Sequence, residues 1–126
     1  MYGDSTIPTP HYSEAVDCAY KIVDVINAYK SAVGLPLTPA ENPERLAGIV
    51  NGVLKFWDNP NISSRENHIN WYQQMVEDGW GWDKVLDEVN RKHPALVIDY
   101  DEIPTLYKVN DQIFMAIANH FIPQSQ

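Results

Sequence analysis

Apolar residues recur at three- and four-residue steps along much of the chain, which is the spacing of one face of an α-helix. The first such stripe follows Ser13, a residue type that caps helices, and it ends at Gly34. We therefore predict a first amphipathic helix between these two residues.

The second stripe gives the cleanest helical pattern. Asn42 and Pro43 are predicted to start the helix, as N-cap and first helical residue, and residues 58–60 to end it. Its expected inward face consists of Leu46, Ile49, Val50, Val53, Leu54 and Trp57.

A third helix is predicted to begin at Ser63, because Ser63 and Glu66 have the spacing of a capping box. Gly79 is expected to end it in a left-handed conformation. Three residues share its expected inward face: Ile69, Tyr72 and Val76.

The following stretch carries mixed signals. The pattern predicts a short helix over residues 83–91, a break at His93-Pro94 and one small strand over 96–98. A helical turn is expected from Ile103-Pro104, followed by a last helix that Asp111 caps. The chain is thus predicted to be mainly α with a minor short β element.

With 126 residues, the chain is expected to form an extended lead-in over residues 1–11 and a single domain over 12–126. Asp and Glu number 17 against 9 Lys and Arg, and the net charge of −8 argues against nucleic-acid and membrane partners. Cys18 lies in an apolar stripe and is predicted to be a core thiol. The amino end lacks the features of a signal peptide, and no apolar run approaches ~20 residues, so we expect a cytoplasmic protein.

The sequence lacks the common motifs of catalysis and cofactor binding. It has no dinucleotide-binding glycine fingerprint, phosphate-binding loop, nucleophile elbow or His-Glu-x-x-His pair. The four histidines, His11, His68, His93 and His120, lie in separate segments without metal-ligand spacing. We therefore predict no metal and no cofactor, and we assign no catalytic residue.

The unusual feature is the run Gly79-Trp80-Gly81-Trp82. In an extended segment both rings would point the same way and form one surface on which a planar ligand could stack, with ~1–3 kcal/mol per contact. In the structural alternative, one tryptophan belongs to the core and the other covers a loop.

Basic residues gather after Trp80. An aromatic surface edged by cations suits a planar anion such as a nucleotide. Neighbouring acidic residues offer the alternative that these cations form surface ion pairs, and His93 beside Pro94 could instead be a structural corner. The cationic set is Lys84, Arg91, Lys92, His93 and Lys108.

Several motifs together resemble the ryanodine-receptor repeat (RyR) domain: His68-x-x-Trp71, Gly79-Trp80, Arg91-x-His93-Pro94-x-Leu96-Val97, Tyr100-Asp101-Glu102-Ile103-Pro104 and Lys108-x-x-Asp111. The resemblance covers residues 63–122, and residues 12–62 look like the helical leader of small phage and bacterial members. The chain departs from the family at Trp82-Asp83, where Tyr-Gly is usual, and at Met75, where a basic residue is common.

The resemblance implies a non-catalytic binding module. Because these repeats face one another in pairs, it also implies a homodimer in which two Trp80 segments line one cleft. For a phage-encoded protein it implies the cytoplasm of the host.

Our leading hypothesis is non-enzymatic binding of an adenine-nucleotide-like or ADP-ribose-like molecule, in a phage protein that sequesters a host immune signalling nucleotide. One alternative is a protein-interaction or structural module without a small-molecule ligand. A weaker one is a nucleotide hydrolase with His68, Asp87 and His93 in acid–base roles. The predicted ligand-binding residues are Trp80, Trp82, Lys84, Arg91, Lys92, His93, Lys108, His68, Trp71 and Tyr100.

Overall fold

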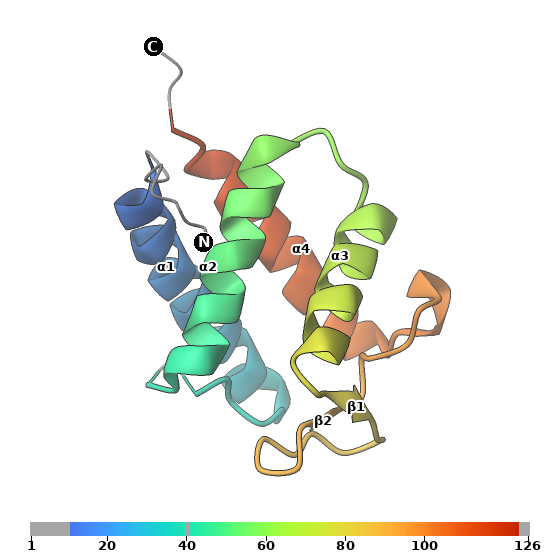
Figure 1. Cartoon of the computed structure of the whole chain (residues 1–126). Helices are drawn as coiled ribbons and strands as arrows, with labels where there is room; N and C mark the ends of the chain where they lie inside the picture. Colours follow the sequence, from blue (N-terminus) through green and yellow to red (C-terminus); the bar gives the residue numbers. More distant parts are fainter. Residues whose placement is uncertain (1–10, 40, 124–126) are drawn as a thin grey trace.

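The computed structural model describes residues 11–39 and 41–123, which form a mainly α structure with a minor β element, as predicted (Figure 1). Residues 1–10 of the expected lead-in lie outside the described residues. No helix in the described ranges is long and apolar enough to cross a membrane. The elements are α1 (Tyr12–Val33), α2 (Pro43–Asp58), α3 (Ser64–Glu77), β1 (Gly81–Trp82), β2 (Lys92–His93), a 3₁₀ turn (Tyr100–Glu102) and α4 (Thr105–His120).

The starts of α2 and α3 confirm the capping predictions. The Asn42 side chain accepts hydrogen bonds from two backbone N–H groups of the first turn of α2, and Pro43 is the first helical residue. Ser63 and Glu66 form the reciprocal capping box at the start of α3. Side-chain oxygens thus satisfy the free N–H groups of both helices.

The glycine stops are also confirmed, whereas the predicted cap of the first helix is wrong. Gly34 has a φ of +80° and Gly79 a φ of +89°, so both adopt the left-handed conformation that other residues avoid. α1 already begins at Tyr12, so Ser13 lies within it. The preceding His11 makes no capping hydrogen bond with its side chain.

The predicted helix over 83–91 and strand over 96–98 are both wrong. Asp87 accepts hydrogen bonds at 3.0 Å from the N–H groups of Val89 and Asn90, and this turn competes with a helix for the same donors. The strands instead lie on either side of this turn, where β1 and β2 pair in parallel over two residues each.

α4 is one continuous helix that begins after Pro104, so the predicted cap at Asp111 is wrong. Asp111 lies in the middle of α4, where its Oδ1 accepts a hydrogen bond of 2.9 Å from Asn67 Nδ2. The predicted inward face of α3 needs a similar correction, because Val76 is 46% exposed. The buried residues of α3 are Asn67, His68 and Met75, and the first two are polar.

The largest apolar cluster joins α1 to α2, and α4 packs against it. Its buried members are Ala15, Cys18, Ala19, Ile22, Val50 and Val53. Cys18 is thus the predicted core residue, and burial raises the pKa of its thiol. Two smaller clusters surround Trp80 and Tyr107 at the other end of the molecule. In the view of Figure 1, α4 crosses behind α2 and α3.

A glycine in α2 offers a test of this packing. A Cβ at Gly52 would lie 3.4 Å from the Phe114 ring of α4, which is ordinary contact. Alanine has the higher helix propensity, so we expect Gly52→Ala to raise the free energy of unfolding by ~0.5–1 kcal/mol in urea denaturation.

Gly48→Ala, one turn earlier, is the matched control for Gly52→Ala. A Cβ there would lie 2.9 Å from Gln74 Nε2, which donates a hydrogen bond to the Gly48 carbonyl. The displaced amide should offset the gain in helix propensity. A loss of stability in Gly52→Ala would show that Phe114 cannot accommodate the methyl group.

Candidate ligand-binding site

The turn that ends α3 sets the direction of Trp80. The N–H of Gly79 donates to the Val76 carbonyl at 3.0 Å, and the N–H of Trp80 donates to the Met75 carbonyl at 2.9 Å. These two bonds define a Schellman motif, in which the residue after the glycine contacts the last helical turn. Trp80 accordingly packs against Met75 and Leu96 and is only 8% exposed.

The prediction that Trp80 and Trp82 form one aromatic surface is wrong. Trp80 belongs to the capping motif of α3, whereas Trp82 lies on β1 and is 55% exposed. One ring is therefore buried against the end of α3, whereas the other is open to solvent. The arrangement matches the structural alternative, with one tryptophan in the core and the other outside it.

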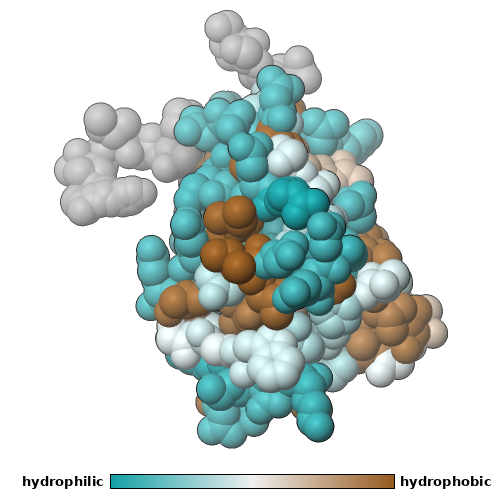
Figure 2. Space-filling model, turned by 90° about the vertical axis from the view of Figure 1, so that its right-hand side faces the viewer, coloured by the Kyte–Doolittle hydropathy of each residue, from teal (hydrophilic) through white to brown (hydrophobic). Residues whose placement is uncertain are grey.

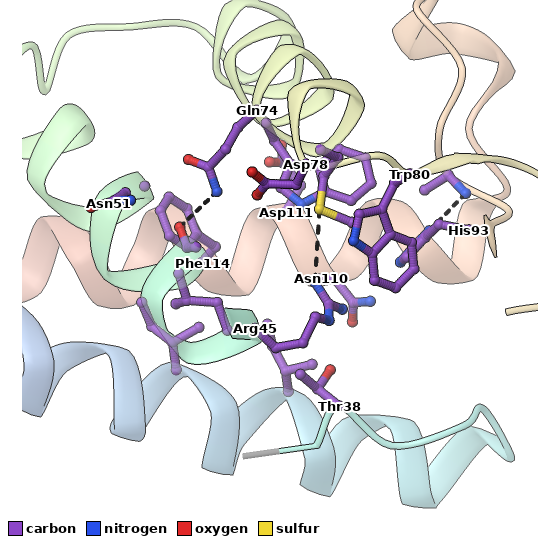
Figure 3. Close-up of a pocket in the computed structure, with 18 of the residues that line it drawn as sticks. Thr38, Arg45, Asn51, Gln74, Asp78, Trp80, His93, Asn110, Asp111 and Phe114 are labelled. Carbon is purple, nitrogen blue, oxygen red and sulfur yellow. Dashed lines mark hydrogen bonds between the residues drawn. The ribbon is translucent and has the colours of Figure 1, made fainter. Parts of the chain in front are cut away.

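A cavity of about 440 Å³ lies among α1, α2, α3 and α4. Figure 3 shows Trp80 and His93 on one side of it, Arg45 and Thr38 on another, and side chains of α4 behind. Its volume falls in the range of ~300–1,000 Å³ that is typical of small-molecule sites. It is the candidate functional site.

Lys30 brings an uncompensated positive charge to this cavity. The residue is 1% exposed, and its Nζ donates a hydrogen bond of 2.9 Å to Thr38 Oγ1. No carboxylate of the described residues lies within 4.0 Å of the ammonium. Burial, and then the charge of Arg45, lower the pKa of Lys30 to about 8, so the side chain is still protonated at neutral pH.

Arg45 is the second cation of the cavity. Its guanidinium lies 4.9 Å from the centre of the Trp80 ring, and its Nε donates to Glu88 Oε1 at 3.1 Å. The Trp80 face and the carboxylate hold the guanidinium in a fixed orientation. Glu88 pairs with Arg45, so among the described cavity residues the cation without an ion pair is Lys30.

Arg91 connects the loop between the two strands to both neighbouring helices. Its side chain donates to Glu44 Oε1 of α2 at 2.6 Å and to the Asp78 carbonyl at the end of α3. Its backbone has a φ of +57°, an uncommon conformation for a residue with a side chain. Arg91 lines the cavity but already has a carboxylate partner.

His93 is a structural corner. Its Nδ1 accepts a hydrogen bond of 3.0 Å from the Ala95 N–H, and its ring lies edge-on to Trp71 and Tyr107 at 5.1 and 5.3 Å. Burial, and then the charges of Arg45 and Lys30, lower its pKa to about 3. The ring is therefore neutral near pH 7 and offers no positive charge to an anion, contrary to its predicted role.

Of the three residues proposed for acid–base chemistry, His68 and His93 line the cavity and Asp87 does not. His68 donates from Nε2 to the Val97 carbonyl at 2.6 Å, because a carbonyl oxygen can only accept. Asp87 uses its carboxylate to form the loop turn and does not line the cavity. The geometry therefore does not favour the nucleotide hydrolase.

The structure divides the ten predicted binding residues into two groups. Those that line the cavity are His68, Trp71, Trp80, Arg91 and His93, and those that do not are Trp82, Lys84, Lys92, Tyr100 and Lys108. Lys108 instead lies over the Tyr100 ring, 5.1 Å from its centre. The predicted cationic edge therefore does not form around Trp80.

The cations that do line the cavity with Trp80 come from a part of the chain that our prediction did not use. Lys30 follows Ile22 and Ile26 at four-residue steps, and this spacing places a lysine on the buried stripe of α1. No sequence pattern indicated that Arg45 would line the cavity, because its partners Trp80 and Glu88 are far away in the sequence.

No protein-family model matches the chain, and no match was found among curated proteins or solved structures. The cavity and its side chains therefore carry the functional inference.

Proposed function

We propose that this protein binds a small anionic, nucleotide-like molecule in the central cavity and does not transform it. The observation that carries the proposal is the buried ammonium of Lys30, which has no carboxylate partner in the described ranges and lies in the same cavity as Arg45. A buried charge is costly unless it is paired. A phosphate or other anion at this position would pair with Lys30 and share Arg45 with Glu88.

Arg45 supports a planar, oxygen-rich anion in particular. A guanidinium presents parallel N–H donors that match phosphate and carboxylate oxygens, and stacking on Trp80 limits its motion before a ligand arrives. Trp71, Tyr107 and Phe114 add apolar walls against which a base could pack. A nucleotide combines both chemical parts.

The finer points of the hypothesis come from the resemblance to the RyR domain. These are the preference for adenine nucleotides or ADP-ribose, the sequestration of a host signalling nucleotide by a phage protein, and pairing of two copies. They stay predictions. If two copies do pair through this segment, the exposed Trp82 is better placed for the contact than the buried Trp80.

A protein-interaction module is the second candidate function. Trp82 at the end of β1 is exposed, and so are Val85 and Val89 on the loop between the strands, with Val89 89% exposed. Figure 2, which views the molecule from the right-hand side of Figure 1, shows a mostly hydrophilic face broken by several apolar patches. Capture of a stable partner without any small-molecule binding would favour this function.

Lys30→Met tests the leading proposal, because it removes the charge and keeps an unbranched side chain. By calorimetry against AMP, ADP, ADP-ribose and pyrophosphate, we expect the wild type to bind at least one of them. The variant should bind it about 10- to 100-fold more weakly, which is the loss expected for a charged hydrogen bond. Its folding stability should be unchanged or higher, since a buried unpaired charge has gone.

The matched control is Lys84→Met, because Lys84 is exposed and lies outside the cavity. It should leave affinity unchanged. The proposal is wrong if the folded wild-type protein binds no member of the panel, or if Lys30→Met binds as tightly as the wild type.

A further inference from the structure

Three residues that line the cavity each have one buried side-chain oxygen with no hydrogen-bond partner in the described protein. The atoms are Glu88 Oε2, Asn110 Oδ1 and Asp111 Oδ2. In folded proteins the great majority of buried polar atoms are paired. Carboxylate and amide oxygens accept hydrogen bonds, so the missing partner should be a donor.

Asp111 is the best defined of the three. One of its oxygens, Oδ1, accepts a hydrogen bond from Asn67 Nδ2 at 2.9 Å, which holds the carboxyl group in place and leaves Oδ2 unpaired. Asn110 is the next residue of α4, and both line the cavity (Figure 3). Together they form an acceptor-rich end of the cavity, on α4, whereas Lys30 and Arg45 come from α1 and α2.

The charges nearby indicate a neutral donor. Arg45 is paired with Glu88, but Lys30 adds a positive charge with no carboxylate within 4.0 Å among the described residues, and this charge would repel an ammonium group of a ligand. Burial raises the pKa of Asp111, because the charged carboxylate loses solvation there. No group of three or more His, Cys, Asp and Glu residues suited to a metal ion occurs in the described chain. Hydroxyl groups are donors without a charge, so the cations of the cavity do not repel them.

We propose that Asn110 and Asp111 bind the hydroxyl groups of a sugar, so that the cavity takes a ribonucleotide with its phosphate at Lys30 and Arg45. The inference rests on the proposed function and narrows its ligand to molecules that carry free ribose hydroxyls. Asp111 Oδ2 accepts from one hydroxyl, and Asn110 Oδ1 is placed to accept from another.

The test compares AMP and ADP with their 2′,3′-dideoxy counterparts by calorimetry. The wild type should bind the ribonucleotide roughly 10- to 100-fold more tightly, because the dideoxy sugar leaves the buried acceptors unpaired. Asp111→Asn keeps the shape and the Oδ1 acceptor but replaces Oδ2 with an N–H₂ group. It should lower the ribose-to-dideoxy ratio, because one of the two acceptors is lost, and leave the dideoxy affinity unchanged.

Asp24→Asn, on the exposed side of α1, is the matched control and should keep the wild-type ratio. Should Asp111→Asn fail to fold, Asn110→Ala provides a second variant. We expect it to lower the ratio of ribonucleotide affinity to dideoxynucleotide affinity.

Equal binding of both sugars by the wild type would overturn the hydroxyl subsite and leave the proposed function intact. The buried acceptors would then be paired with water. Wild-type protein that binds none of the four nucleotides would overturn the hydroxyl subsite, and protein that also fails to bind ADP-ribose and pyrophosphate would overturn both proposals.

Discussion

Replacing Trp80 with alanine is expected to lower the free energy of unfolding by about 3–5 kcal/mol, the usual cost of removing a large aromatic side chain from a core. Trp80 packs between Met75 and Leu96 and supports the Arg45 guanidinium on its face. The variant should therefore lose affinity for a ligand only as a consequence of lost packing. Urea denaturation with an unchanged m-value would measure the effect.

Trp82→Ala is the matched control for Trp80→Ala, since it removes the same side chain two residues later from an exposed position. We expect it to change stability by less than about 0.5 kcal/mol. Comparable losses in both variants would contradict the inside–outside division of the two rings. A stable Trp80→Ala that lost only ligand affinity would restore the stacking surface predicted from the sequence.

Acidification from pH 6.5 toward pH 3 is expected to destabilise the protein through His93. The folded chain holds its pKa at about 3, whereas the unfolded chain has the ordinary value near 6.5. Between these values the unfolded state binds a proton that the folded state does not, so stability falls as pH falls. The slope is about 1.4 kcal/mol per pH unit, or roughly 3 kcal/mol between pH 6.5 and pH 4.

Asp111 acts in the opposite direction over the acidic part of this range. Its pKa is raised in the folded state by burial, so there the folded chain holds the extra proton and acidification favours folding. The observed slope will therefore contain both contributions, together with those of other carboxylates. A comparison with a variant isolates the histidine.

His93→Asn is suited to that comparison, because its Oδ1 can still accept from the Ala95 N–H. The variant should be less stable at pH 7 through lost ring packing, yet its stability should depend less steeply on pH below 6.5. Parallel slopes for the wild type and His93→Asn would show that His93 does not titrate on unfolding.

Helix boundaries were predictable here where one side chain decides them. Asn42 and Ser63 supply hydrogen bonds that the first helical turn lacks, and Gly34 and Gly79 supply a backbone conformation that few other residues adopt. The loop between the strands was not predictable in this way. Its apolar residues have helical spacing, but the Asp87 side chain accepts hydrogen bonds from backbone N–H groups that a helix would need. Strands of two residues are too short to show the alternation of apolar and polar residues that identifies a strand in a sequence.

The binding site was predicted less well because its parts are distant in the sequence. Trp80 was correctly singled out as unusual, but the residue that covers its face is Arg45, 35 positions earlier. Cations near Trp80 in sequence, such as Lys84, point elsewhere. A short sequence pattern can single out an unusual residue such as Trp80. Which residues contact it depends on how α1 and α2 pack against α3 and α4.

The packing of α1 against α4 has a consequence for how the protein is made. Tyr29 donates to the Leu106 carbonyl and Trp57 to the Ala118 carbonyl, so the first two helices complete their contacts only with α4. At ~5–20 residues per second, the roughly 70 residues between Val33 and Thr105 take about 4–14 s to synthesise. Throughout that interval the surfaces of α1 and α2 that pack against α4 stay uncovered, so the nascent chain exposes apolar side chains until α4 has been made.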